Sequence, residues 1–265
     1  MRVLALALVL ISLSFAIQMV DPHLMEVNEG DTVDLGIMGP GQTMEVSIHP
    51  KVYEGGVHGI GGNYDLAYVT SLPEGWKSTR SKLYGDPLQV TVTAEPLAKE
   101  GTYYINIAVE DEGNGELLGV VNFVAKVEIS NDVMDAEVSP LEQRVGIAQP
   151  ATFEITITNR GNAGDVFRVS AEGVPKWSFT KTIYVSGKGS KKLLYEVAAH
   201  EEEKYEPSIV VESASSSLVK KSMPVEIYVY PDVFSDYKAI SNGALLFPIV
   251  EAPVYALMGL LSNLW

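Results

Sequence analysis

The sequence predicts an all-β protein made of two β-sandwiches in tandem, followed by a hydrophobic C-terminal tail. Three observations lead to this fold class: short runs of alternating apolar and polar residues between Gly, Pro and Asn, an internal repeat, and an apolar segment at each end of the chain. The chain has 265 residues, of which 46% are hydrophobic and 20% are charged. Such a composition can supply the cores of two domains of ordinary size.

Composition excludes several kinds of chemistry. The chain contains no cysteine, which rules out disulfides, thiolate-bound metals and a thiol nucleophile. Its 34 acidic residues outnumber 19 basic ones, and the formal net charge is −15. Because a nucleic-acid binder needs a cationic face to neutralise phosphates, we expect no nucleic acid among the partners.

The first 16 residues are typical of a secretory signal peptide. Arg2 gives a basic start, residues 3–13 form an apolar run, and Ser14-Phe15-Ala16 supplies the small-residue pattern of a cleavage site. The run is shorter than the roughly 20 residues that span a bilayer, which favours removal over a permanent anchor. The alternative is a buried N-terminal strand or helix. We therefore expect cleavage after Ala16 and a mature chain outside the cytoplasmic membrane.

Between its ends the chain has the periodicity of strands. Apolar side chains alternate with Thr, Glu, Lys or Asn in several short runs, as in strands with one face on a core. The positions expected to face a core include Val90, Val92, Val121, Phe123, Ala125, Val127, Phe153, Ile155, Ile157, Val225, Ile227 and Val229.

The chain also repeats itself. Residues 72–76, Leu-Pro-Glu-Gly-Trp, match residues 174–177, Val-Pro-Lys-Trp, and residues 103–110 match residues 205–212. The offset of about 100 residues is the size of one immunoglobulin-like sandwich. The repeat therefore predicts a tandem of two such sandwiches.

The repeat sets the predicted domain boundaries. We expect domain 1 over residues 17–130 and domain 2 over residues 136–230, with residues 131–135 between them. Domain 1 is the more acidic, because residues 17–128 carry 6 basic and 17 acidic residues while residues 129–230 carry 11 and 14. If the tail contacts a membrane, domain 2 is the less repelled by anionic head groups, and domain 1 projects outward.

Domain 2 carries a family resemblance. A strand that starts at Ala151 ends in Asn159-Arg-Gly-Asn162, and a second motif, Gly173-Val-Pro-Lys-Trp177, follows. This stretch resembles the NPCBM-associated immunoglobulin-like domains found beside α-galactosidases, and related repeats in archaeal surface proteins. The resemblance implies an extracytoplasmic accessory or surface module and an archaeal source, and it transfers no catalytic residue.

Each of the two motifs has a physical interpretation. We interpret Asn-Arg-Gly-Asn as a tight turn in which Gly161 takes a positive φ. The Pro–Trp motif predicts a corner that buries an indole at the end of the sandwich.

No catalytic motif is present, and we predict neither an enzyme nor a cofactor. The four histidines are scattered, and nucleophile-elbow and phosphate-loop patterns are missing. Two acidic segments, residues 110–116 and 131–137, have a composition that suits calcium. The Asn-Gly pair in the first also predicts a hairpin that needs no metal, so we assign no metal site.

A glycine-rich stretch over residues 55–63 is the most distinctive insertion of domain 1. We interpret it as a flexible, extended loop, with a ligand or partner contact through His58, Asn63 and Tyr64 as the functional alternative. Exposed tyrosines of the same domain can stack on sugars or pack along strands. The candidates are Tyr53, Tyr64, Tyr68 and Tyr84.

Residues 239–265 form an apolar tail whose only charge is Glu251. Pro248 and Pro253 divide it into two short helical pieces. In the second piece apolar residues recur at helical spacing and an aromatic residue suited to a membrane interface ends the chain. The expected contact residues are Leu257, Leu260, Leu261, Leu264 and Trp265. The tail can enter a lipid interface, dock into a membrane protein, or fold back on domain 2.

Two functions follow from these features. The first is a non-catalytic extracytoplasmic surface protein that presents two immunoglobulin-like domains and is tethered through its tail to a membrane or membrane complex. A cell-surface protein or a glycan is then a further partner. The second is a secreted carbohydrate-binding or enzyme-accessory module.

Overall fold

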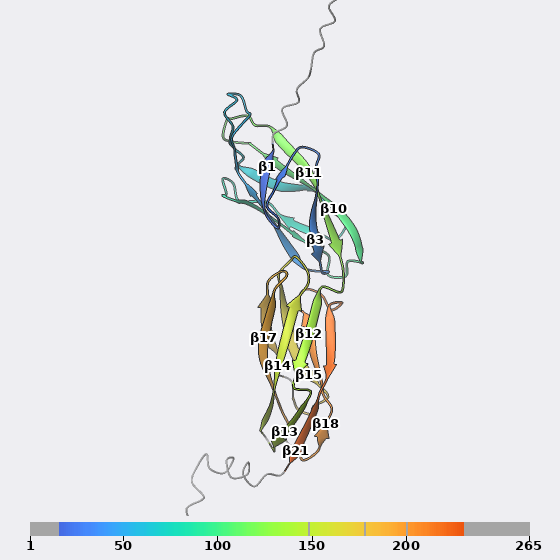
Figure 1. Ribbon diagram of the computed structural model, residues 1–265. Helices are drawn as coiled ribbons and strands as arrows, with labels where there is room; N and C mark the ends of the chain where they lie inside the picture. Colours follow the sequence, from blue (N-terminus) through green and yellow to red (C-terminus); the bar gives the residue numbers. More distant parts are fainter. Residues whose placement is uncertain (1–15, 148, 178, 200, 231–265) are drawn as a thin grey trace, which may run out of the picture.

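The computed structural model describes residues 16–147, 149–177, 179–199 and 201–230, and all their regular elements are β-strands (Figure 1). The all-β prediction is confirmed. In this part of the chain no helix is long and apolar enough to cross a membrane. The hydrophobic tail with its expected helices, and the signal peptide apart from Ala16, lie outside the described residues.

Domain 1 is a sandwich of two main sheets and one small strand pair. The first sheet has the strand order β2 (Met25–Val27), β1 (Ile17–Asp21), β4 (Thr43–His49), β9 (Leu88–Thr93), β8 (Lys77–Thr79). The second has the order β3 (Thr32–Met38), β11 (Val120–Ile129), β10 (Gly101–Glu110), β7 (Leu66–Ser71). The small pair is β5 (Lys51–Val52) and β6 (Gly62–Asn63). The pairing is antiparallel except between β3 and β11, and the inner faces share one hydrophobic core.

Domain 2 is a sandwich in which the larger face is broken in two. One face has the order β12 (Met134–Ser139), β14 (Pro150–Asn159), β17 (Ser190–Ala198). The other consists of β13 (Glu142–Gly146), β21 (Glu226–Tyr230), β18 (Lys204–Tyr205), and of β16 (Lys181–Val185), β15 (Asp165–Glu172), β19 (Ser208–Ser213), β20 (Lys220–Pro224).

Prolines explain the break in the larger face. Pro207 separates β18 from β19 and Pro224 ends β20, and neither has an N–H for the ladder. The N–H of Val225 donates to the Pro207 carbonyl at 2.9 Å, which keeps the two parts together.

The two domains share a strand topology. In domain 1 the first strand, β1, pairs with β4, as β12 pairs with β14 in domain 2. The strand before the Pro–Trp motif, β7 or β15, pairs with the strand that contains most or all of the repeated segment, β10 or β19. Each also has a tyrosine whose hydroxyl donates to a carbonyl four residues upstream: Tyr103 to Lys99 at 2.9 Å and Tyr205 to Glu201 at 3.4 Å. This tyrosine corner is typical of immunoglobulin-like sandwiches. Its two copies lie at aligned positions of the sequence repeat.

The burial of side chains agrees with the strand periodicity. The twelve positions expected to face a core, from Val90 to Val229, are all buried. They divide between two hydrophobic clusters, one in each domain. Alternation therefore predicted the inner faces of these strands.

The Asn-Arg-Gly-Asn turn differs from its prediction. Gly161 is not among the residues with positive φ. The side chain of Asn159 shapes the turn instead, because its Oδ1 accepts from the N–H of Gly161 at 2.9 Å and its Nδ2 donates to the Ala163 carbonyl at 2.8 Å. The turn also packs closely on domain 1: a Cβ on Gly161 would lie 3.3 Å from the carbonyl oxygen of Ile37, a tight contact.

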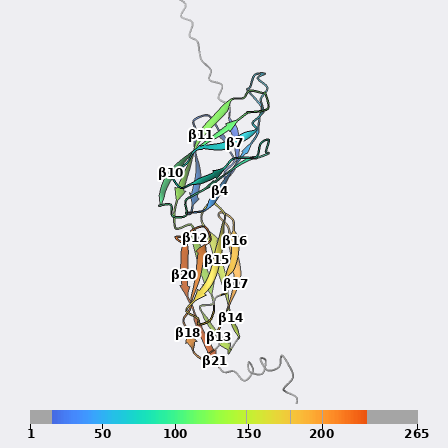
Figure 2. The same ribbon diagram turned by 180° about the vertical axis from the view of Figure 1, so that it is seen from behind.

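This turn joins the two domains, which lie end to end (Figures 1 and 2). The N–H of Asn162 donates to the Ile37 carbonyl at 2.6 Å, and Asn162 Oδ1 accepts from the Ile37 N–H at 3.0 Å. Gly36 has a φ of +88°, and a Cβ there would overlap the Asn162 side chain. Ala163 is part of the domain 1 core, while Ile37 packs on the core of domain 2.

A buried carboxylate completes the joint. Asp165 of domain 2 is only 4% exposed and Gln42 of domain 1 is 0% exposed. Gln42 Nε2 donates to Asp165 Oδ2 at 2.9 Å, and Gln42 Oε1 accepts from the N–H of Gly39. The other donors to Asp165 are Ser213 Oγ, Ser215 Oγ and Val166 N. Tilting the domains would break bonds that water cannot easily replace.

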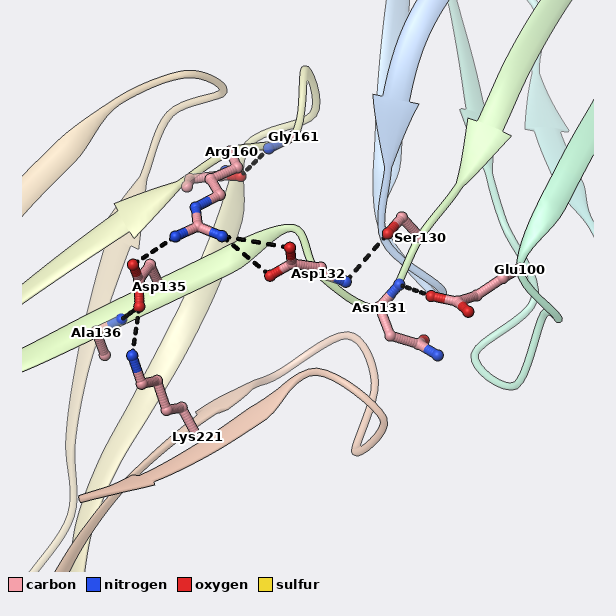
Figure 3. Close-up of polar contacts among 10 residues, drawn as sticks. Glu100, Ser130, Asn131, Asp132, Asp135, Ala136, Arg160, Gly161 and Lys221 are labelled. Carbon is pink, nitrogen blue, oxygen red and sulfur yellow. Dashed lines mark hydrogen bonds and ion pairs between the residues drawn. The ribbon is translucent and has the colours of Figure 1, made fainter. Parts of the chain in front are cut away.

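The acidic connection between the domains is paired with cations of domain 2 (Figure 3). Arg160 reaches Asp132 at 3.1 Å and Asp135 at 2.5 Å, and Lys221 reaches Asp135 at 2.5 Å. The hydrogen bond from Lys221 holds the pKa of Asp135 below its usual value. These side chains are partly exposed, so each pair adds only about 0–1 kcal/mol. Carboxylates of this segment thus have partners within the chain.

Substituting Gln42 tests the joint. We expect Gln42→Ala to lower the free energy of unfolding by about 1–3 kcal/mol, because it removes a donor to buried Asp165 and an acceptor for Gly39. Chemical denaturation measures this loss, and small-angle scattering should show a wider spread of interdomain angles.

Gln89→Ala is the matched control, because the Gln89 amide bonds Glu45 on the exposed face of domain 1. It should change neither quantity. A Gln42→Ala protein with wild-type stability and scattering would contradict a joint held by this contact.

Candidate functional site

The loops of domain 1 that lie furthest from domain 2 form the candidate site. β4 starts beside Gln42 at the joint and ends at His49, so the segment after it lies at the opposite end (Figure 1). β9 begins and β10 ends at this same end. We call residues 50–65, 80–87 and 111–119 the distal loops.

The first distal loop contains a short hairpin rather than the extended loop that we expected. β5 pairs with β6, and a bridge joins Gly55 to Ile60. Gly61 has a φ of +78°, and a Cβ there would overlap the Val52 carbonyl, so this tight return requires glycine. The hairpin is also fastened to its neighbour, since the N–H of Val57 donates to the Glu116 carbonyl at 2.9 Å.

The predicted contact residues of this loop differ in their exposure to solvent. His58 and Asn63 are exposed, whereas Tyr64 is only 1% exposed and belongs to the core of domain 1. The expectation that the Tyr64 ring is presented to a partner was therefore wrong. Alternation explains the difference, because Asn63 points outward in β6 and the next side chain points inward.

The four candidate tyrosines also divide by exposure. Tyr53 is 75% exposed and Tyr84 is 60% exposed. Tyr68 is half-buried, and its hydroxyl donates to Glu110 Oε2 at 3.0 Å, a bond that raises its pKa. Tyr53 and Tyr84 are thus the two whose rings are available to a ligand.

Asp65 holds the three distal loops together. It is fully buried, and its Oδ1 and Oδ2 accept from the N–H groups of Glu112 at 2.9 Å and Gly113 at 2.6 Å. Its own carbonyl accepts from the N–H of Tyr84 at 2.9 Å. Asp65 was not among the residues predicted from the sequence; the available signal was a carboxylate in the otherwise apolar stretch Tyr64-Asp-Leu-Ala67.

The acidic cluster at 110–116 lies in a hairpin, as the Asn-Gly pair predicted, with Glu110 paired to Val120. Asp111 caps its turn: Oδ1 accepts from the Asn114 N–H and Oδ2 from the Leu118 N–H, both at 3.1 Å. Among the described residues no group of three or more His, Asp or Glu side chains is arranged to hold a metal ion. Two carboxylates of this region, Asp65 and Asp111, thus serve backbone amides.

A surface hollow of about 230 Å³ opens between the distal loops. Its lining comes from all three: Pro50, Asn63, Tyr64, Tyr84, Gly85, Asp86 and Asn114. The hydroxyl of Tyr64 is buried and has no hydrogen-bond partner among the described residues. Burial raises the pKa of Tyr64 to about 12, with a smaller contribution from the charge of Asp111.

Comparison with known proteins gives structural neighbours only. No family model and no curated protein matches the chain. A chimeric titin Z1Z2 carrying a decorin peptide aligns with 83% of this chain and 99% of its own, at 11% identity and a TM-score of 0.34. The D00–D0 domain of intimin aligns with 82% of this chain and 100% of its own, at 11% identity and a TM-score of 0.26.

A β-glucosidase from Listeria innocua in complex with glucose aligns with 37% of this chain, at 15% identity and a TM-score of 0.29. The match spans only 16% of that enzyme.

Removing the Asp65 carboxylate should loosen the neighbouring loop. In Asp65→Ala the amides of Glu112 and Gly113 lose their acceptor, and we expect a loss of about 1–3 kcal/mol in local stability. Amide hydrogen exchange should show faster exchange at these two residues. The exposed Asp86→Ala is the control and should leave their protection unchanged; equal protection in both variants would refute the clamp.

Tyr64 should make the protein sensitive to alkaline pH. Because its pKa is about 12 when folded and near 10 ordinarily, the unfolded chain releases this proton first. The associated stability is complete below about pH 10 and is lost as pH rises towards 12. Urea unfolding at several pH values should show a smaller alkaline loss for Tyr64→Phe than for wild type. Equal losses would place the Tyr64 hydroxyl in an ordinary solvated environment.

Proposed function

We propose that the protein is a non-catalytic extracytoplasmic surface protein that presents its distal loops to a partner and is tethered at the other end to a membrane or membrane complex. One observation carries the proposal: β21, the last described strand, ends at Tyr230, at the end of the molecule furthest from the distal loops (Figure 2). The hydrophobic residues 239–265 follow this end in sequence. A tether there leaves the distal loops pointing away from the surface.

The start of the first strand is consistent with secretion. β1 begins at Ile17, directly after the expected cleavage point, and Ile17 is buried in the core. Removal of residues 1–16 would therefore leave every described strand intact. The resemblance of domain 2 to NPCBM-associated domains and archaeal surface repeats belongs to the same proposal.

The charge distribution supports this orientation. Domain 1 is strongly acidic, and domain 2 carries Arg160, Lys192 and Lys221 in surface ion pairs that offset its own acids. An anionic membrane surface would repel domain 1 more than domain 2. With the tail as tether, the acidic domain lies outermost.

A secreted carbohydrate-binding module is the second candidate. It is favoured by the exposed ring of Tyr84 at the rim of the hollow between the distal loops. Sugar binding is compatible with the tethered protein as well, so only the fate of the tail separates the two candidates.

The tether is tested by membrane sedimentation. We expect the full chain to pellet with membranes, and expect a chain lacking residues 239–265 to stay in the supernatant. A length-matched variant with Leu257, Leu260, Leu261 and Leu264 all changed to Ser should behave like the deletion. His58→Ala, at the opposite end of the molecule, should pellet like wild type.

An alkaline carbonate wash then separates the two kinds of tether. Pelleting that survives the wash means contact with lipid, and pelleting lost in the wash means docking on a membrane protein. A full chain that never pellets, or a tailless chain that still does, would contradict the proposal. The first of these outcomes would favour the secreted module.

A further inference from the structure

We infer that the hollow between the distal loops binds a single neutral sugar ring, which stacks on Tyr84. This inference rests on the second candidate function and deepens it, and it is independent of the tether because the site lies within domain 1 and does not involve the tail. It assigns a chemical class of ligand to the outward end of the molecule.

The ring of Tyr84 forms one wall of the hollow. Tyr84 belongs to the second distal loop, yet its hydroxyl lies against Gly113 of the third: a Cβ on Gly113 would be 2.6 Å from Tyr84 Oη. Glycine at 113 thus lets the tyrosine cross the gap between the loops. The tip of the side chain lies close to Gly113, and 60% of its surface is exposed. A flat, exposed ring is a platform on which the apolar face of a sugar can stack.

The backbone of Tyr84 is held in an unusual conformation. Its φ is +57°, in the left-handed region that few non-glycine residues occupy. Two backbone bonds keep it there: Tyr84 N–H to the Asp65 carbonyl at 2.9 Å, and Gly85 N–H to the Lys82 carbonyl at 3.2 Å. Such residues persist where their surroundings fix them, and they gather at ligand-binding sites.

Polar residues line the same hollow as Tyr84 and can bond sugar hydroxyls. Asp86 supplies a carboxylate acceptor, and Asn63 and Asn114 supply amides that can donate and accept. Asn114 is oriented by a bond from its Nδ2 to the Asn63 carbonyl at 2.6 Å. Tyr64 also lines the hollow, although its hydroxyl is buried.

Size and charge define the ligand further. At about 230 Å³ the hollow is smaller than the roughly 300–1,000 Å³ that accommodates a drug-sized ligand, so it suits one ring rather than an extended oligosaccharide. Asp86 lines it, and Asp111 and Glu112 lie in the adjoining loop. These carboxylates disfavour acidic sugars. We therefore assign a neutral pyranose rather than an acidic one.

Saturation-transfer NMR tests this site. The full mature chain is kept soluble in phosphatidylcholine nanodiscs, with empty nanodiscs as the blank. The probes are methyl glucoside, methyl mannoside, methyl galactoside and N-acetylglucosamine, with glucuronate as the acidic comparator. We expect transfer to at least one neutral probe at millimolar concentration and weaker transfer to glucuronate.

Variants locate the binding. Tyr84→Ala should weaken the neutral sugar about tenfold, the upper range for loss of an aromatic contact, while Tyr84→Phe should retain it. Tyr53→Ala is the matched control, because Tyr53 is also exposed, on the first distal loop, but does not line this hollow. Asp86→Asn removes a negative charge and should raise glucuronate binding relative to neutral probes.

The outcomes are decisive in each case. Absence of transfer to every neutral probe would overturn the inference, as would binding that survives Tyr84→Ala or is lost in Tyr53→Ala. If thermal melting shows that Tyr84→Ala is unfolded, Tyr84→Phe and Asp86→Asn decide the question. Failure of sugar binding with intact membrane pelleting would leave the tether in place, so the two proposals are tested separately.

Discussion

Asp165 and Gln42 come from different domains, are buried together, and can keep their hydrogen bonds only in one relative placement of the two sandwiches. Buried polar groups that lose their partners cost more than the bond itself contributes, so this contact acts as a constraint on direction. The two hydrogen bonds between Asn162 and Ile37, one of them accepted by the Asn162 side chain, add a second point of attachment. Two separate contacts fix the angle between the domains, whereas the connecting residues alone would fix only the distance between them.

The distal loops rely on the same physical device at a smaller scale. Buried Asp65 accepts from amides of another loop and so holds Glu112 and Gly113 against the stretch that contains Tyr84. A buried carboxylate thus holds together the loops that line the hollow. Acidic residues, whose number at first suggests solubility or calcium, here also accept hydrogen bonds from backbone amides in loops outside the sheets.

Local pattern predicted the strands well and the contacts between distant segments poorly. Alternation identified the inner faces, and the repeat aligned Tyr103 with Tyr205, because both signals depend on neighbours in sequence or on a fixed period. The bond between Gln42 and Asp165 joins positions 123 residues apart, and that between Asp65 and Gly113 joins positions 48 apart. The periodicity of the sequence carries no information about pairs of residues so far apart in the chain. The positive φ expected at Gly161 was wrong for a local reason, because the Asn159 side chain two residues earlier bonds the turn.

The parallel pairing of β13 with β21 has a mechanical consequence. Five residue pairs, from Glu142 with Glu226 to Gly146 with Tyr230, connect the last strand to its neighbour. A pull on the chain beyond Tyr230 acts along the axis of β21, so it loads these pairs in shear and together. Peeling would open them one after another at a lower force. If the molecule is held at one end and pulled at the other, β21 must therefore separate from β13 along its whole length before domain 2 can unfold.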